Sequence, residues 1–354
     1  METELKFQVP PAHAAALRRA VATASARSVR LQALYADTAD QRLAGAGLAL
    51  RLRKEGRVWV QTLKGRGDGL MRRLEHELRL PPGPGEPTLD PQRHAGTAAG
   101  ELLARVLDDG ASLLTLYRTD IRRLHRRVRH GGALIEIAYD HGRIVADGRA
   151  VAVDEIEFEL ISGPPAALPA LAARWAARFG LWWDVRTKSE RGMRLALGRD
   201  QVPAVKAAAA ELPADAGPGE AWSAVLQSAL VQALPNAAEI AAGTDAPEHL
   251  HQLRVALRRL RSALRWFAAW SGDADAAHAL ELEWREPFRR LGAARDTDVL
   301  THSLQPALVA AGAPPFTWPA AAAGAGPGEI VRSAGFTALL LRTLALSLRP
   351  AAAA

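Results

Sequence analysis

The sequence predicts an α+β protein, with an antiparallel β-sheet or barrel and flanking helices in residues 1–197 and an all-α domain in residues 221–354. Short segments of the first part alternate polar and apolar residues, which is the period of a β-strand. Beyond residue 220 this alternation stops, and longer segments carry apolar residues at helical spacing. Residues 198–220 are rich in Ala, Pro, Gly and Asp, which predicts a linker between the domains.

The individual elements follow from these periodicities. The expected strands are residues 2–9, 48–54, 58–64, 74–80, 121–130, 133–140, 143–146 and 154–161. The expected helices are residues 11–25, 166–179, 222–234, 247–270, 274–291 and 329–348. Residues 81–91 are rich in Pro and Gly and predict a loop, and residues 310–328 form a second stretch of low complexity.

The composition of the 354-residue chain excludes several classes of site. It contains no Cys, which excludes disulfides, zinc–thiolate sites and cysteine nucleophiles. Hydrophobic residues make up 49% of the chain, too many for a wholly disordered protein. No apolar run reaches the roughly 18 residues that a membrane span needs. No charged-then-apolar leader is visible, so we expect a soluble, cytoplasmic protein.

The basic residues indicate anionic partners. The chain has 45 Lys and Arg against 38 Asp and Glu, a formal net charge of +7. Only five of the bases are Lys, and the planar fork of Arg suits phosphate oxygens better than an ammonium group does. The Arg-rich composition therefore indicates anionic partners, and a genome-wide base composition that favours Arg is the alternative explanation.

Charged side chains form rows along the expected strands. Glu2, Glu4 and Lys6 share one face of the first strand, because alternate side chains point the same way. The other rows are Arg51 with Arg53, Arg73 with Glu75 and Glu77, Glu136 with Asp140, and Glu155 with Glu157 and Glu159. Neighbours in a row lie about 7 Å apart, so carboxylates repel one another unless solvent, bases or metal compensate. One such row is typical of the wet face of an antiparallel sheet.

The repetition of these rows favours a second interpretation. Acidic rows and basic rows occur on separate strands of one domain. If the strands closed into a barrel with the charged faces inward, they would line a polar lumen. Acidic rows could hold Mg²⁺ or Mn²⁺, which prefer oxygen ligands, and basic rows could hold phosphate oxygens. This arrangement suits a complex of a metal with a polyphosphate substrate.

The second part carries an independent signal for anion binding. The segment 247–270 has a stripe of Leu at helical spacing, next to a stripe that is almost free of acids. The basic stripe consists of His251, Arg254, Arg258, Arg261 and Arg265, with Arg259 alongside. Because a solvated helix face normally mixes charge signs, this stripe indicates an anionic ligand. Membrane-surface binding and nucleic-acid binding are the competing interpretations.

The strand motifs resemble those of the CYTH, or triphosphate tunnel metalloenzyme, superfamily. The first is Glu2-Thr3-Glu4-Leu5-Lys6, which looks like the ExExK signature of that family. The others follow in the family's order and are residues 50–53, 62–65, 73–77, 119–123, 135–140, 155–160 and 188–192. The eight motifs occur in this order over nearly 190 residues, which makes the resemblance specific.

The resemblance implies an eight-stranded antiparallel tunnel that binds a triphosphate together with Mg²⁺ or Mn²⁺, one or two ions per tunnel. By position, the residues that would hold the triphosphate are Lys6, Arg51, Arg53, Lys64, Arg73, Arg123 and Lys188. The residues that would hold metal are Glu2, Glu4, Glu157 and Glu159, with Glu75, Glu77, Glu136 and Asp140 in supporting positions. Glu2, Glu157, Glu159 and Lys6 are the expected catalytic residues. Of the adjacent Arg122 and Arg123, only one can face inward, and the resemblance favours Arg123.

Residues 251–261 and 291–299 are similar to the CHAD domain, a helical module that is fused to CYTH domains and associated with polyphosphate binding. CHAD domains usually contain two related helical repeats, whereas this sequence has one such basic helix. The resemblance therefore implies a shortened copy over residues 221–354.

The sequence as a whole predicts a metal-dependent inorganic triphosphatase that cleaves tripolyphosphate to orthophosphate and pyrophosphate. Phosphoryl transfer needs charge neutralisation and positioning more than covalent chemistry, and a bound metal could also activate water. The same tunnel could serve adenylate cyclisation or thiamine triphosphate hydrolysis. A non-catalytic polyphosphate-binding protein is a further alternative. Membrane and nucleic-acid partners are not expected, and the oligomeric state stays open.

Overall fold

The chain folds into two compact units. The first unit contains residues 1–168 and 185–202, and the second contains residues 169–184 and 203–354. The computed structural model describes residues 2–67, 70–83, 85–107, 111–199, 202–300, 304–314 and 325–348, without the side chains of Arg66 and residues 294–299. Among the described helices, none combines the length and the apolar composition of a membrane span.

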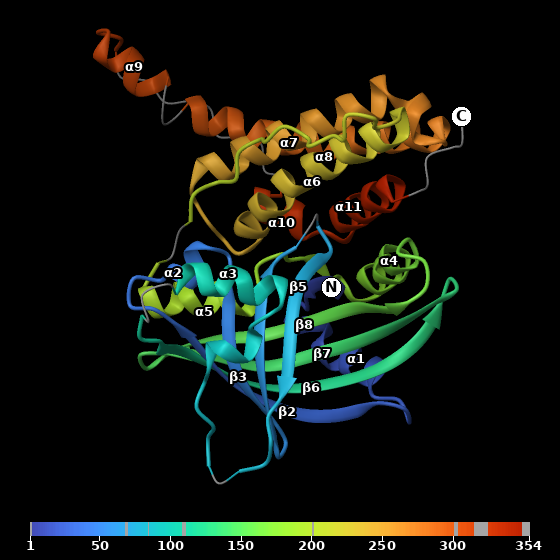
Figure 1. Cartoon of the computed structure of the whole chain (residues 1–354). Helices are drawn as coiled ribbons and strands as arrows, with labels where there is room; N and C mark the ends of the chain where they lie inside the picture. Colours follow the sequence, from blue (N-terminus) through green and yellow to red (C-terminus); the bar gives the residue numbers. More distant parts are fainter. Residues whose placement is uncertain are drawn as a thin grey trace. The chain divides into compact units, whose positions relative to one another are not determined.

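Eight strands of the described part of the first unit form a closed antiparallel barrel (Figure 1). Their order is β5-β4-β3-β2-β6-β7-β8-β1, and pairing of β1 with β5 closes the ring. The strands are β1 (Glu2–Gln8), β2 (Arg27–Asp37), β3 (Ala49–Glu55), β4 (Val58–Arg66), β5 (Arg72–Arg79), β6 (Leu114–His130), β7 (Ala133–Ala146) and β8 (Arg149–Ser162). The expected α+β class and antiparallel barrel are confirmed.

Helices cover parts of the outer face of the barrel, where the strands with charged inner rows present their apolar side. Leu50 of β3 and Leu63 of β4 pack against Leu43 and Leu103. Leu43 belongs to the short helix α2 (Arg42–Gly45), and Leu103 belongs to α3 (Ala98–Val106). Helix α1 (Pro11–Val21) contacts β6 and β7, and Figure 1 shows α3 lying across β5. Burial of these apolar faces leaves the charged rows on the inside.

Four strands differ from the prediction. Strand β8 begins at Arg149, five residues before the expected start, and pairs there with the end of β7. Strand β2 was not predicted, and its buried residues Leu31, Ala33 and Tyr35 place an apolar row on the inner face. Strand β7 is continuous where two strands were expected, because His141 and Gly142 keep their pairing with β6. Strand β6 begins at Leu114, well before the expected start, and pairs there with the end of β2.

Helix α5 (Lys188–Leu197) fills one end of the barrel. Met193 and Leu195 pack against an apolar cluster of the inner face that includes Tyr35, Tyr117 and Ile144. Gly192 allows this approach, because a Cβ atom there would lie 2.2 Å from the Tyr117 ring. The sequence predicted a motif in this segment but no helix. The helix starts with a capping box, in which the side chain of Thr187 accepts from the Glu190 amide and the Glu190 side chain accepts in return.

In its described residues the second unit contains helices and the two-residue strand β9 (Trp182–Trp183), in agreement with the prediction of an all-α second part. Its helices are α4 (Ala167–Phe179), α6 (Pro218–Ala241), α7 (Pro247–Trp266), α8 (Ala274–Val299), α9 (Gln305–Ala310), α10 (Pro327–Arg332) and α11 (Ala334–Ser347). Two short 3₁₀ helices also occur, η1 (Pro91–His94) in the first unit and η2 (Ala268–Ser271) in the second.

Four predicted helix C-termini and one predicted helix are wrong. Helix α1 ends at Val21 and not at residue 25, and α8 continues to Val299 and does not end at residue 291. Helix α6 continues through Pro235 instead of ending before it. Helix α7 ends at Trp266, and the 3₁₀ turn η2 takes up the rest of the expected segment. The single helix expected over residues 329–348 is broken at Ser333, whose extended backbone (φ −66°, ψ 144°) interrupts it and whose hydroxyl caps α11. The apolar periodicity continued across this break and concealed it.

Candidate active site

The pairing register brings the predicted charged rows onto one continuous inner face. Glu4 lies opposite Glu159, which lies opposite Glu136. Across the closing pair, Glu2 lies opposite Arg73. The predicted tunnel residues that share this face are Glu2, Glu4, Lys6, Arg51, Arg53, Lys64, Arg73, Glu75, Glu77, Arg123, Glu136, Asp140, Glu157 and Glu159. Lys188 reaches the same face from α5.

Arg123, and not Arg122, points inward. The Arg123 guanidinium donates to both carboxylate oxygens of Asp140 at 2.7 Å and to Glu157. Arg122 lies opposite Arg30 and His141 on the outer face, where it is exposed. The strand alternation therefore selects the arginine that the family resemblance favoured.

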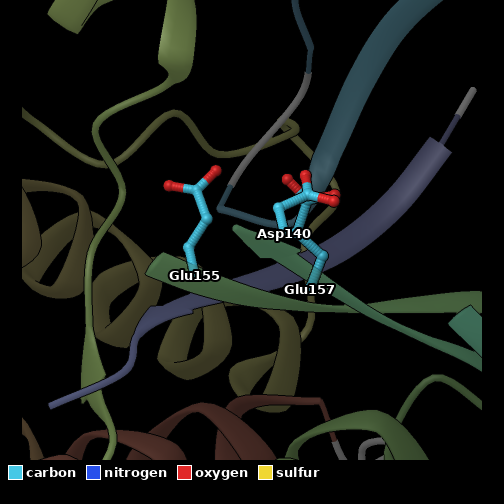
Figure 2. Close-up of side chains that lie close together, drawn as sticks. All are labelled: Asp140, Glu155 and Glu157. Carbon is cyan, nitrogen blue, oxygen red and sulfur yellow. The ribbon is translucent and has the colours of Figure 1, made fainter. Parts of the chain in front are cut away.

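Asp140, Glu155 and Glu157 form a compact acidic trio. One carboxylate oxygen from each lies within 4.8 Å of the others, and Figure 2 shows the three side chains projecting to the same side of their strands. This spacing could hold a cation, and the cation that lies there is the ammonium group of Lys188. Its Nζ lies 2.8 Å from Asp140 and 2.8 Å from Glu157, and it also pairs with Glu155.

The trio is neutralised by an equal number of bases. Arg123 pairs with Asp140 and Glu157, and Arg191 lies 3.2 Å from Glu155. Burial alone would raise the pKa of Glu157, but Lys188 and Arg123 outweigh it and hold that pKa well below its ordinary value. Burial would lower the pKa of Lys188, but the trio raises it well above the ordinary value. Glu157 and Lys188 are therefore ionised and paired with each other at neutral pH.

A second acidic group lacks this balance. Glu2 pairs with Lys64 at 3.0 Å, and Glu4 pairs with Arg73 at 3.0 Å. Glu159 lies between these acids and has no ion pair in the described part of the chain. Burial, followed by repulsion from Glu2, Glu136 and Glu4, raises the pKa of Glu159 to about 7. A divalent cation would relieve this excess of negative charge, and carboxylate oxygens are the ligands that Mg²⁺ and Mn²⁺ prefer.

The bases of the inner face are held by carboxylates and hydroxyls of the barrel itself. Lys64 also pairs with Glu75 at 3.1 Å, and Arg53 pairs with Glu77 at 3.0 Å. Arg51 donates to the Tyr35 hydroxyl at 3.1 Å. Lys6 donates to the carbonyl oxygen of Arg186. These donors are oriented and largely shielded from solvent, and phosphate oxygens could replace their present acceptors.

In the second unit, α7 carries the expected basic stripe. Arg258 and Arg265 are exposed. Arg254 and Arg261 are half-buried, and each guanidinium carbon lies 5.0 Å from the centre of the Phe288 ring. His251 is half-buried on the same helix. The side chains of residues 294–299, in the second predicted CHAD motif, lie outside the described part.

Arg259 is directed away from this stripe and into the helical packing. Its guanidinium donates to the Gln232 side chain and the Ser228 hydroxyl, both at 2.9 Å, and to the Ala208 carbonyl at 3.0 Å. Ala208 belongs to the segment predicted as a linker, and in the same segment Val205 exchanges two hydrogen bonds with the buried Asn236. Arg259 thus joins this segment to α6 and α7.

Comparison with known families agrees with the antiparallel barrel. The CYTH domain model matches residues 1–181, just over half of the chain. The chain belongs to the CYTH family. The CHAD domain model matches residues 224–352. The boundaries predicted at residues 197 and 220 remain predictions.

Individual relatives of this CYTH protein are distant. The inorganic triphosphatase of Haemophilus influenzae is 27% identical over 164 residues, which cover 46% of this chain and 44% of that protein. The chain thus matches less than half the length of this curated relative. A proposed adenylate cyclase of Bacillus halodurans gives a TM-score of 0.39 at 18% identity, over 54% of this chain and 96% of the other. A proposed adenylyl cyclase of Hippeastrum is described as having a dominant triphosphatase activity. It gives a TM-score of 0.37 at 22% identity, over 57% of this chain and 98% of the other.

The sequence analysis missed several residues of the CYTH barrel's inner face. Glu155 was recognised in an acidic row but was given no role, although its side chain is completely buried. Arg191 belongs to the last predicted motif, and its pairing with Glu155 depends on the orientation of α5. Tyr35 stacks on Tyr117 with ring centres 4.7 Å apart. Because β2 was not predicted, the sequence carried no signal for this aromatic pair.

Proposed function

We propose that this CYTH protein hydrolyses inorganic tripolyphosphate to orthophosphate and pyrophosphate in the presence of Mg²⁺ or Mn²⁺. The observation that supports this most directly is the composition of the inner face. Seven bases and an unneutralised carboxylate, Glu159, share one closed barrel. Such a face offers charge-assisted donors to a polyanion and oxygen ligands to a divalent cation.

The bases would bind and orient the phosphate chain. They are Lys6, Arg51, Arg53, Lys64, Arg73, Arg123 and Lys188, contributed by β1, β3, β4, β5, β6 and α5. Because they surround the inner face, they would contact successive phosphoryl groups and hold the attacking and leaving oxygens in line.

Glu2, Glu4 and Glu159 are the residues that we assign to the metal. Bound there, the ion would neutralise phosphate charge and lower the pKa of a coordinated water molecule. Glu157 and Asp140 were also predicted as metal ligands, but their oxygens accept from Lys188 and Arg123. We therefore assign these two carboxylates to the orientation of bases.

The relative from Haemophilus influenzae supports the hydrolase assignment, since it is an inorganic triphosphatase at 27% identity. The match covers 44% of that protein, and ATP or thiamine triphosphate would present the same triphosphate group to the same bases. Substrate identity is therefore part of the proposal and is decided by experiment.

The test is phosphorus NMR of tripolyphosphate incubated with the protein and Mg²⁺ or Mn²⁺, with EDTA as the metal-free control. We expect orthophosphate and pyrophosphate to appear only with metal, and Glu159→Gln to abolish their formation. Asp120→Asn is the matched control, because Asp120 is an outer-face carboxylate paired with Arg30. Turnover of ATP or thiamine triphosphate, with tripolyphosphate unchanged, would assign the barrel to an organic triphosphate instead.

We propose that the basic stripe of α7 binds inorganic polyphosphate. Arg258 and Arg265 are its exposed members, and Arg254 and Arg261 extend it along the helix. The match of residues 224–352 to the CHAD domain supports this assignment. Retention of the protein by immobilised polyphosphate at fixed ionic strength tests it, with duplex DNA as the competing polyanion.

A further inference from the structure

Glu155 is a buried carboxylate whose bonding groups come mainly from one helix. Its side chain is 0% exposed, and it lies on β8 opposite Gln8 of β1. One oxygen pairs with the Lys188 ammonium, and the other lies 3.2 Å from the Arg191 guanidinium. Gln8 adds a hydrogen bond of 3.3 Å. A buried charge of this kind is tolerated only when it is paired, and both of its charged partners belong to α5.

The charge balance around the trio leaves no need for a divalent ion. Asp140, Glu155 and Glu157 carry three negative charges, and Lys188, Arg191 and Arg123 carry three positive charges. A divalent cation at 2.0–2.6 Å from these oxygens would have to displace the ammonium group that already lies 2.8 Å from two of them. The unbalanced charge lies elsewhere, at Glu159.

We propose that Asp140, Glu155 and Glu157 form a binding pocket for the Lys188 ammonium group, and that Glu155 is the residue that positions Lys188 and α5 in the barrel. The pocket has the spacing of a metal site, but its cation is supplied by the chain. The positioning role rests on the proposed function, because Lys188 is one of the bases assigned to the triphosphate. The identity of the cation in the pocket does not rest on it.

Three further contacts fix α5 in the same orientation. The Ser189 hydroxyl lies 2.9 Å from the Tyr117 hydroxyl, and Gly192 packs against the Tyr117 ring. Arg191 also donates to the carbonyl oxygen of Ala152 on β8. The helix can therefore not rotate without leaving Glu155 unpaired, which is why a single carboxylate can set the position of the Lys188 ammonium.

The decisive experiment counts Mn²⁺ ions bound per chain, by calorimetric titration of the full-length protein. Lys188→Met empties the pocket of its ammonium, so we expect one additional Mn²⁺ site relative to the unmodified protein. Adding Glu155→Gln to Lys188→Met should remove that extra site, and Glu155→Gln alone should leave the count unchanged. A loss of one Mn²⁺ in Glu155→Gln alone would make the trio a metal site and overturn the proposal. An unchanged count in Lys188→Met would also overturn it.

The positioning role has its own measurement. Glu155→Gln should raise the KM for tripolyphosphate at least about tenfold, while kcat changes little and Glu155→Asp restores part of the loss. Asp154→Asn is the matched control, because this neighbouring carboxylate accepts from Tyr139 and His141 on the outer face and should leave both constants unchanged. A fall in kcat with unchanged KM would refute the positioning role.

The Mn²⁺ counts distinguish failure of the ammonium-pocket proposal from failure of the proposed function. If Glu155→Gln does not fold, Lys188→Met still decides the proposal through its Mn²⁺ count and through its melting temperature, which Mn²⁺ should raise more than that of the unmodified protein. If the unmodified protein does not cleave tripolyphosphate, the proposed function fails, while the Mn²⁺ counts still report which cation the pocket holds.

Discussion

Glu4 of β1 and Glu159 of β8 lie directly opposite each other on the inner face of the barrel. Glu136 of β7 lies on the other side of Glu159, so three acids form one row across three neighbouring strands. Like charges at directly opposite positions destabilise a sheet. Arg73 compensates Glu4, and His125 lies 3.3 Å from Glu136. Glu159, in the middle, is the member whose pKa rises to about 7.

Metal affinity should depend on pH through Glu159. Below about pH 7 a proton must leave this carboxyl group before it can bind a cation, so Mn²⁺ affinity should fall about tenfold per pH unit. Above pH 7 the affinity should level off. Calorimetric titrations at pH 6, 7 and 8 measure this dependence. Glu159→Gln should weaken binding and abolish the slope, and an equal slope in that variant would assign the proton to another group.

The stability of the metal-free barrel should fall as pH rises. The pKa of Glu159 is raised from an ordinary value of 4.5 to about 7, so between these values the folded state holds a proton that the unfolded state has lost. This contribution is fully present below about pH 4.5 and is lost as pH approaches 7. We expect the melting temperature of Glu159→Gln to exceed that of the unmodified protein at pH 7.5 in EDTA. Equal melting temperatures of the two proteins would contradict an excess of negative charge around Glu159.

Substitution by Met should reduce activity at Arg123 and leave it almost unchanged at the adjacent Arg122. Arg123→Met removes three charge-assisted hydrogen bonds to Asp140 and Glu157 together with one substrate base. We expect kcat/KM for tripolyphosphate to fall roughly 100-fold, about 3 kcal/mol of transition-state stabilisation. Arg122→Met changes an exposed outer-face residue and should stay within about twofold of the unmodified enzyme. Comparable losses in both variants would show that strand β6 does not present Arg123 to the substrate.

Gly192→Ala should destabilise the first unit. The new Cβ would lie 2.2 Å from the Tyr117 ring, and this ring is packed against Tyr35. We expect a loss of about 1–3 kcal/mol in the free energy of unfolding, typical of overpacking. Urea unfolding measures it, with Gly45→Ala as the control, because a Cβ at Gly45 would meet nothing within 4 Å. Equal effects of the two substitutions would argue against close packing of α5.

The bases of α7 should separate into ligand-binding and structural residues. Replacing both Arg258 and Arg265 by Ala removes exposed charge, so we expect weaker retention on immobilised polyphosphate with an unchanged melting temperature. Arg259→Ala should lower the melting temperature and leave retention unchanged, because its guanidinium donates to Gln232, Ser228 and Ala208. Its cost to stability should be about 1–3 kcal/mol. Loss of retention in Arg259→Ala at full stability would move this residue into the binding surface.

The strands with charged inner faces could be predicted because period-two alternation is a local property of the chain. Glu2, Glu4 and Lys6 share a face in any regular strand, and the barrel keeps them together. Strand β2 escaped prediction because its inner row is apolar, with Leu31, Ala33 and Tyr35, and its outer row mixes Arg30 with Gln32 and Leu34. Helix α5 was not predicted because its contacts come from distant strands. Lys188 in its first turn pairs with Glu155, and its apolar residues pack against the inner face of the barrel.

The sequence by itself determined which residues share a face on each charged strand, because alternation needs only the neighbouring residues. It also determined that the strands carry acidic rows, which suit cations, and basic rows, which suit phosphate oxygens. Only the tertiary structure decided how these charges are shared, because Coulomb energies depend on distances between strands and α5 that the spacing along the chain does not contain. That is why Glu157, adjacent on its face to Glu159, has its pKa lowered by Lys188 and Arg123, while the pKa of Glu159 rises to about 7.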